Sequence, residues 1–232
     1  MINIFKSTKI FVACPSQVAT GGPLALHQLA YKLQSKGYNS VIYYYDNWVG
    51  ENPTHVNYQH YETSYVTEIE DRDQNILIVP ESDTFLLYNF SKIKRVIWWL
   101  SIDNYYPSAK GLKYTFFYYL GLRKQFEFKD SNKFYHLAQS KYALEFLKSQ
   151  NIIDNKRIGV LSDYLLKIFF KENEISKKEN IVLYNPMKGK KFTKKIISEN
   201  LDLNWIPIEN LTPIEVKNLL NTSKIYIDFG EH

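Results

Sequence analysis

Residues 9–37 read KIFVACPSQVATGGPLALHQLAYKLQSKG and contain three successive structural patterns. The first six residues, Lys9–Cys14, form a short apolar run that ends at a proline, which is typical of a buried β-strand. Apolar residues then recur at helical spacing up to Gly37, after a loop that contains Gly21 and Gly22. The stretch therefore predicts a strand, a glycine-containing loop and a helix.

The alternation of apolar runs and helical segments continues along the chain. Further strands are predicted at residues 41–45, 76–79, 95–100, 134–138 and 158–161. A helix is predicted from Ser140 through Leu147, whereas residues 46–75 are polar and irregular. Strands that alternate with helices indicate βαβ units, which build a mostly parallel sheet. The predicted fold class is therefore α/β.

A charged segment separates these elements from a second series. Residues 171–179 carry a dense run of charged side chains with little periodicity. We therefore predict a first domain of residues 1–165, a linker of residues 166–180 and a second domain of residues 181–232. Both domains are expected to be Rossmann-like.

The second domain repeats the pattern on a smaller scale. Strands are predicted at residues 181–184, 205–208 and 225–228, and helices near residues 193–199 and after residue 212. The last helix has a start signal in which Thr212 is the cap, Pro213 takes the first helical position and Glu215 completes a capping box. A doubly wound domain usually needs about five or six strands, so this domain is expected to be incomplete.

Composition limits the classes of function. Of the 232 residues, 45% are hydrophobic and 23% are charged, as in globular proteins with a packed core. The net charge of +5 alone does not choose between nucleic acid, a membrane surface and an anionic substrate. Cys14 is the only cysteine, so an intrachain disulfide is excluded, which fits a reducing cytoplasm. No apolar run approaches the roughly 20 residues that span a bilayer.

The loop before the first helix contains Gly21 and Gly22. Backbone amides at a helix N-terminus can approach an anion or a sugar hydroxyl, and glycine permits the closest approach because it has no Cβ atom. The loop lacks the third glycine of the dinucleotide fingerprint, which argues against a nicotinamide-dependent enzyme. A tight turn without a ligand is the alternative interpretation.

A second loop, Asn185–Lys191, follows the first strand of the second domain and opens its first helix. Lys188, Lys190 and Lys191 lie beside a glycine there, and their charges combine with the helix dipole to attract a diphosphate. The loop is too short, and has too few glycines, for a P-loop. A solvated basic turn is the alternative interpretation.

Acidic side chains follow two predicted strands of the first domain, at the edge where α/β proteins bind ligands. Asp103 comes just after the fourth strand and is the candidate general base, which would remove the proton of an acceptor hydroxyl in an inverting transfer. A retaining enzyme would need donor contacts at this position instead. Glu81, after the third strand, and His27, in the first helix, are secondary candidates for this role. The alternatives are a turn residue for Asp103 and a packed or surface residue for His27.

The segment from Lys110 to Lys129 interleaves basic residues with aromatic and leucine side chains. An amphipathic helix of this kind can lie in a membrane interface, with its rings at headgroup depth and its lysines against anionic lipid. We therefore expect a surface helix with mixed exposure that makes peripheral contact with a membrane. Aromatic side chains in the core and solvated lysines are the alternative.

Six segments along the chain have an informative order and spacing. They are Ala19–Leu26, Trp98–Asn104, Ala138–Tyr142, Leu161–Tyr164, Asn185–Gly189 and Ile225–His232. Together they resemble bacterial GT-B glycosyltransferases of surface-polysaccharide clusters, such as those for capsule or O-antigen. The resemblance covers nearly the whole chain, although no one segment is diagnostic. In such enzymes the N-terminal domain holds the acceptor, the C-terminal domain holds the nucleotide-sugar, and the chemistry takes place between them.

The resemblance implies a place for each candidate residue. Gly21, Gly22 and Glu81 would border the acceptor side, whereas Asn185, Lys188, Lys190, Lys191 and Glu231 would lie on the donor side. Residues 1–165 would then be the acceptor domain. Residues 181–232 would be part of the nucleotide-sugar-binding domain.

We therefore expect a glycosyltransferase that moves a sugar from a nucleotide-sugar to a bacterial surface glycan or a lipid-linked acceptor. The nucleotide-sugar is a substrate, and no metal or other cofactor is expected, because lysines and a helix dipole can stabilise the leaving diphosphate. No nucleic-acid partner is expected, and the expected location is cytoplasmic, peripheral to the inner face of the membrane. These 232 residues are expected to be inactive alone. The alternative function is a non-catalytic, truncated relative that acts as a binding or scaffold module.

Overall fold

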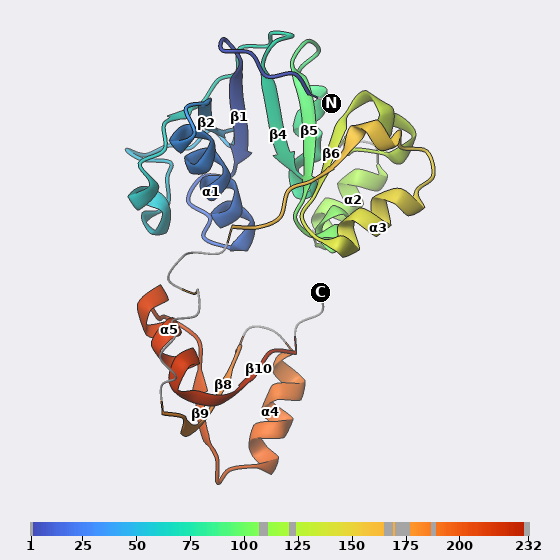
Figure 1. The fold of residues 1–232 in the computed structure, drawn as a ribbon. Coiled ribbons are helices and arrows are strands. Elements are labelled where there is room, and N and C mark those ends of the chain that lie inside the picture. Colours follow the sequence, from blue (N-terminus) through green and yellow to red (C-terminus); the bar gives the residue numbers. More distant parts are fainter. Residues whose placement is uncertain are drawn as a thin grey trace. The chain divides into compact units, whose positions relative to one another are not determined.

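The computed structural model describes residues 2–106, 111–120, 124–164, 169, 177–186 and 189–229. Contacts divide the chain into two compact units, Met1–Tyr164 and Leu165–His232. Each unit contains a parallel sheet with helices packed against it (Figure 1). The predicted α/β fold class is therefore confirmed.

The first unit has a seven-stranded parallel sheet in the order β3-β2-β1-β4-β5-β6-β7. Its strands are β1 (Lys9–Cys14), β2 (Asn39–Tyr44), β3 (Tyr65–Val66), β4 (Ile76–Pro80), β5 (Lys94–Trp99), β6 (Tyr135–Ala138) and β7 (Ile158–Val160). Its α-helices are α1 (Gly21–Ser35), α2 (Leu112–Tyr119) and α3 (Lys141–Ser149), and its 3₁₀-helices are η1 (Val56–Tyr61), η2 (Glu81–Tyr88), η3 (Ile102–Tyr105), η5 (Phe128–Lys133) and η6 (Asn155–Arg157). Each predicted strand is present, whereas β3 lies in a region predicted to be irregular.

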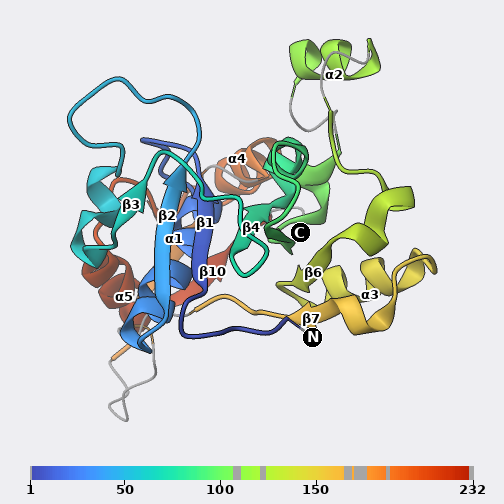
Figure 2. The same cartoon turned by 90° about the horizontal axis from the view of Figure 1, so that it is seen from above.

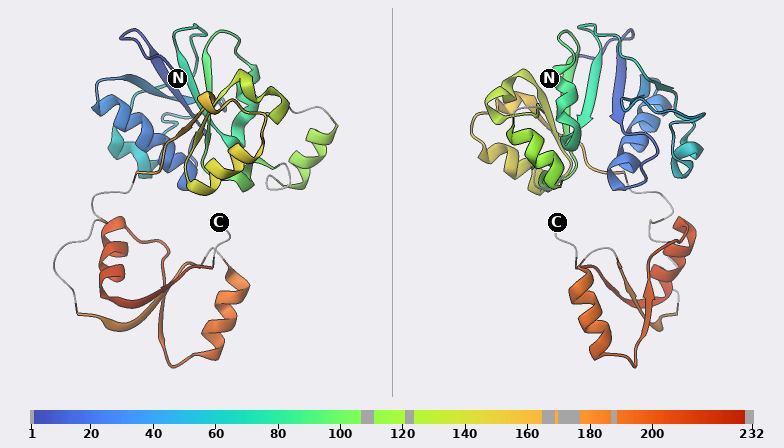
Figure 3. Two further views of the ribbon diagram at one scale, coloured as in Figure 1. Left: turned by 45° about the vertical axis from the view of Figure 1, so that its right-hand side comes forward. Right: turned by 180° about the vertical axis from the view of Figure 1, so that it is seen from behind.

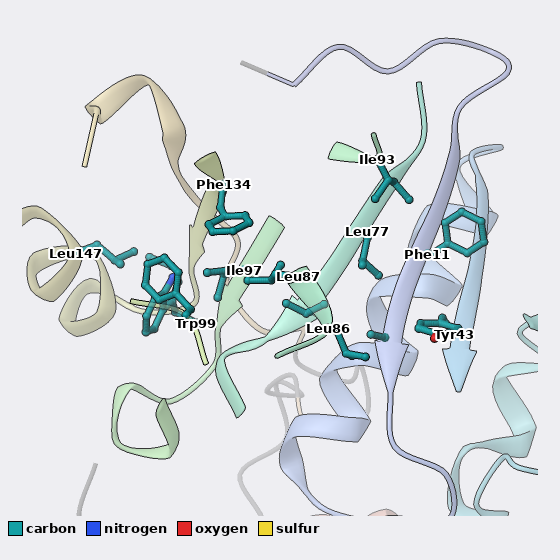
Figure 4. Close-up of a cluster of buried hydrophobic side chains, with 14 of the residues drawn as sticks. Phe11, Tyr43, Leu77, Leu86, Leu87, Ile93, Ile97, Trp99, Phe134 and Leu147 are labelled. Carbon is teal, nitrogen blue, oxygen red and sulfur yellow. The ribbon is translucent and has the colours of Figure 1, made fainter. Parts of the chain in front are cut away.

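Both faces of the first sheet are covered. Successive side chains of β1 point to opposite faces, and each set belongs to a different buried cluster. Phe11 and Ala13 belong to a buried cluster in which η2, α3 and the segment before β6 pack on the sheet (Figure 4). Ile10 and Val12 belong to a second cluster, which α1 covers. Parallel strands that are buried on both faces have near-continuous apolar sequences. This is why the apolar runs predict the strands of this unit.

Among its described residues, the segment 110–129, predicted to be one surface helix, is α-helical over Leu112–Tyr119, has no helix at residues 124–127, and ends in the 3₁₀-helix η5. Phe126 is fully buried, and the centroid of its ring lies 5.8 Å from that of Trp99 and 5.9 Å from that of Phe134. The prediction of a continuous surface helix is therefore wrong for the second half of the segment, because rings distant in sequence hold Phe126 in the core. Within the described ranges, no helix has both the length and the apolar character to cross a membrane.

Trp99 and His136 form a polar contact inside the aromatic cluster. The Nε1–H group of Trp99 donates to His136 Nδ1 at 3.1 Å, and His136 Nε2–H donates to the carbonyl oxygen of Ser131 at 3.0 Å. Burial lowers the pKa of His136 to about 4, so the imidazole is neutral at physiological pH. Both ring nitrogens are satisfied, which identifies His136 as a core residue.

The second unit has a three-stranded parallel sheet in the order β10-β8-β9. Its elements are β8 (Glu179–Tyr184), α4 (Lys190–Glu199), β9 (Asn204–Pro207), α5 (Pro213–Thr222) and β10 (Ser223–Ile227). In Figure 3, α4 and α5 lie on either side of this sheet. The predicted capping box is present at the start of α5, where Glu215 N–H donates to Thr212 Oγ1 and Thr212 N–H donates to Glu215 Oε2.

Leu147→Ala is expected to lower the free energy of unfolding of the first unit by about 2–5 kcal/mol, because this fully buried side chain of α3 leaves a cavity when it is removed. Leu112→Ala makes the same chemical change on α2, where the side chain is 92% exposed. It is expected to change the free energy of unfolding by less than about 0.5 kcal/mol. Urea denaturation of the two variants measures the difference, and equal losses would contradict the exposure of α2.

Candidate functional site

The first sheet has a topological switch point between β1 and β4. From β1 the chain adds β2 and β3 on one side, and it then adds β4 through β7 on the other. In open α/β sheets, ligands bind outside the carboxyl ends of the strands at such a point. The loop after β1 leads to Gly21 and Gly22 at the start of α1, and β4 leads directly to Glu81. The predicted glycines and Glu81 thus flank the switch point.

Glu81 is a buried carboxyl group at this edge. Its side chain is 2% exposed, and its Oε2 atom accepts a hydrogen bond from Leu100 N–H at 2.8 Å. Burial raises the pKa of Glu81 to about 7, although hydrogen bonds from Leu100, Ser101 and the side chain of Asn104 favour the ionised form. The carboxyl group therefore gains and loses a proton near neutral pH, which is the property of a general acid or base.

Gly21 and Gly22 leave space beside the N-terminus of α1. A Cβ atom added at Gly21 would have no neighbour within 4 Å, and one added at Gly22 would lie 3.9 Å from Leu100 Cδ1. Neither glycine has a positive φ, so the fold itself does not require glycine at these positions. The first N–H groups of any α-helix lack intrahelical acceptors. Leu100 connects the two candidates, because its side chain lies beside Gly22 and its N–H group donates to the carboxyl group of Glu81.

Asp103, the candidate base of the sequence analysis, follows β5 in η3, and its side chain is exposed. It lies one strand further from the switch point than Glu81 does. The residue after it, Asn104, is the one whose side chain binds the Glu81 carboxyl group. The catalytic role of Asp103 stays a prediction.

His27 is packed inside the first unit. Its Nδ1 atom is 2.7 Å from the carbonyl oxygen of Pro23, and its Nε2 atom is 2.8 Å from the hydroxyl oxygen of Tyr44. The ring of Tyr58 stacks on the imidazole with 4.5 Å between centroids. Burial lowers the pKa of His27, which favours the neutral imidazole. Both ring nitrogens have a hydrogen-bonding partner. These contacts fit the interpretation of His27 as a packed residue better than its interpretation as a general base.

The second sheet has its switch point between β8 and β10. The chain leaves the central strand β8 to add β9 on one side and then β10 on the other. Asn185 directly follows β8 and Asp228 directly follows β10. Asn185 Nδ2 donates to Asp228 Oδ2 at 3.2 Å, and Asn185 N–H donates to the carbonyl oxygen of Ile227 at 3.1 Å. The predicted donor-side residue Asn185 thus lies at the ligand edge of this sheet.

Lys190 and Lys191 occupy the first turn of α4, where both are exposed and no acidic residue is present. A cation at a helix N-terminus opposes the helix dipole, at a cost of roughly 0.3–1 kcal/mol. An anion bound there would relieve this repulsion. Gly189 precedes them with a left-handed φ of +56°, and a Cβ atom at this position would lie 2.5 Å from Phe229 Cβ. Unlike Gly21, Gly189 is therefore required by the fold.

Two predicted donor-side residues, Lys188 and Glu231, lie outside the described residues. Two residues that the sequence analysis did not assign are Asn104, which binds Glu81, and Asp228, which binds Asn185. Each follows an apolar run at the carboxyl end of a strand. That position is the signal by which sequence reasoning could have found them.

A scan against models of known protein families finds no match for this chain, and neither does a search of curated proteins. A functional assignment therefore depends on the side chains at the two sheet edges. Among the residues that the structure describes, no three His, Cys, Asp or Glu side chains are grouped so as to hold a metal ion.

Gly21→Ala is expected to leave the melting temperature of the first unit unchanged or slightly higher, because the added Cβ atom meets nothing within 4 Å and alanine restricts the unfolded chain. Gly189→Ala introduces the same group at a left-handed residue against Phe229. It is expected to destabilise the second unit by more than about 1 kcal/mol. Thermal denaturation followed by circular dichroism compares the two. A destabilised Gly21→Ala variant would show that the fold, and not a ligand, requires that glycine.

Glu81 is expected to make the chain less stable by about 3 kcal/mol as the pH rises from about 4.5 to about 7. The folded state binds the Glu81 proton more tightly than the unfolded chain does. The contribution of Glu81 to the free energy of unfolding is therefore fully present below about pH 4.5 and is mostly lost at about pH 7. Glu81→Gln preserves the shape of the side chain and does not titrate.

Urea denaturation of both proteins at several pH values measures this effect. The free energy of unfolding of the variant, relative to wild type, should rise across the interval. Parallel pH profiles would contradict the raised pKa.

Proposed function

We propose that the chain is a nucleotide-sugar-dependent glycosyltransferase of the GT-B class, whose first unit binds the acceptor and whose second unit binds the donor diphosphate. The observation that supports this most is that each parallel sheet has its candidate residues at its own switch point. In this proposal the unit that contains the three-stranded sheet binds the nucleotide-sugar. The acceptor is a bacterial surface glycan or a lipid-linked saccharide.

Glu81 is the proposed proton acceptor. Its ionised carboxylate takes the proton of the acceptor hydroxyl while the hydroxyl oxygen forms a bond to the anomeric carbon of the donor sugar. The bond from that carbon to the phosphate oxygen breaks, and its electron pair leaves with the nucleoside diphosphate. A pKa of about 7 keeps a substantial ionised fraction at neutral pH. Asp103 is the rival base, since it is exposed at the end of the neighbouring strand.

The second unit supplies the groups that a leaving diphosphate needs. Lys190 and Lys191 carry positive charge at the N-terminus of α4, where the helix dipole also favours an anion. Asn185 and Asp228 lie at the ligand edge of the same sheet and offer hydrogen-bonding groups for sugar or ribose hydroxyls. The proposal therefore needs no metal to stabilise the leaving group.

A second candidate function is a saccharide-binding module that does not catalyse transfer. The burial of Glu81 favours it, because a buried carboxyl group that accepts hydrogen bonds from Leu100 and Asn104 also stabilises the turn after β5 without any catalytic role. The two functions differ in the second unit. A transferase binds a nucleotide-sugar there, whereas a module needs only the saccharide.

Isothermal titration calorimetry with common nucleotide-sugars is expected to show weak binding to this chain. A dissociation constant near 1 mM corresponds to about 4 kcal/mol. Lys190→Ala and Lys191→Ala are each expected to weaken this binding by roughly three- to tenfold, because each removes one charge from the first turn of α4. Added salt should weaken the wild-type interaction in the same direction.

Lys194→Ala is the matched control, since it removes an exposed lysine from the second turn of the same helix. Its affinity for the nucleotide-sugar should equal that of wild type. Equal losses in all three variants would indicate non-specific attraction by the basic helix. Saccharide binding without any nucleotide-sugar binding would favour the binding module.

A further inference from the structure

A stripe of apolar side chains is exposed along α2 and at Leu120, the residue that caps its C-terminus. Leu112, Phe116, Tyr119 and Leu120 are 92%, 61%, 78% and 55% exposed. Their spacing of four, seven and eight residues from the first places them on one face of a helix. Figure 2 shows α2 standing off from the sheet of the first unit. The stripe is therefore presented to the solvent, where such a face is unfavourable unless something binds it.

The sequence around the stripe is strongly basic. Residues 104–126 contain no Asp or Glu, and their basic residues are Lys110, Lys113, Arg123 and Lys124. This interval therefore carries +4 of the net charge of +5. Lys124 is exposed, whereas Lys110 and Arg123 lie outside the described residues. An apolar stripe and a concentration of positive charge thus share one short part of the chain.

We propose that α2 binds the surface of an anionic lipid membrane. Leucine and aromatic side chains enter the boundary between headgroups and acyl chains, while lysine and arginine attract anionic headgroups. A second copy of the chain fits this surface less well, because it would bring the same positive charge against itself. Nucleic acid would use the charge but leave the two leucines exposed to water. The membrane satisfies both features.

This inference goes beyond the proposed function and does not depend on it. Membrane binding by α2 uses no residue of the second unit, and no donor is needed to observe it. If the chain is a glycosyltransferase, α2 holds the acceptor-binding unit at the surface where a lipid-linked saccharide is found.

Vesicle flotation tests the proposal. The chain is expected to float with vesicles of phosphatidylglycerol and phosphatidylcholine, and about tenfold less with phosphatidylcholine alone. The double variant Leu112→Ser/Tyr119→Ser is expected to lower partitioning to the anionic vesicles by roughly tenfold or more. Both substituted side chains are largely exposed, so the fold should persist. Circular dichroism of the variant checks this.

The matched control is Tyr142→Ser on α3, where the side chain is 56% exposed outside the basic interval. Its flotation should equal that of wild type. A second control, Lys190→Ala/Lys191→Ala, should also float normally, which separates this inference from donor binding. Equal flotation of the stripe variant and wild type would overturn the proposal. So would a dimer, seen by analytical ultracentrifugation, that the stripe variant dissociates, because a second copy would then occupy the stripe.

Discussion

The parallel pairing of β1 with β4 is the contact on which the geometry of the first unit depends. It sets Ile10 opposite Ile76 and Val12 opposite Ile78, in strands that are far apart in the sequence. Because the earlier strands lie on one side of this pair and the later strands on the other, the connections at its carboxyl end diverge. The second sheet repeats the arrangement with β8 and β10. The same topological constraint therefore fixes where each unit can bind a ligand.

At the first of these points, two opposing effects act on one carboxyl group. Hydrogen bonds from the turn after β5 stabilise the ionised form of Glu81, yet burial outweighs them and the pKa rises. Lys190 and Lys191 at the second point are likewise unfavourable neighbours of a helix N-terminus. Local arrangements that oppose stability tend to gather at functional sites. In this chain they occur at both switch points.

The sequence predicts those features that depend on neighbours along the chain. The capping box at Thr212 is local, and β1 is a continuous apolar run because both faces of its sheet are buried. The position of Glu81 at a strand end could be predicted in the same way, but its raised pKa could not, since that depends on the turn after the neighbouring strand. The sequence also could not predict where the helix α2 ends, because Phe126 joins the core through rings that are distant in sequence. The two-residue β3 has no apolar run to reveal it.

The placement of the tryptophans gives each unit its own spectroscopic signal. Trp99 is fully buried and donates its indole hydrogen to a neutral His136, whereas Trp48 is 45% exposed. Trp205 lies in β9 of the other unit and donates to the carbonyl oxygen of Asn200 at 2.8 Å. Replacing Trp205 with phenylalanine would leave tryptophan fluorescence, excited near the red edge of the absorption band, only from the seven-stranded unit. The folding of the two units can thus be resolved within one molecule, without attached dyes and without cutting the chain.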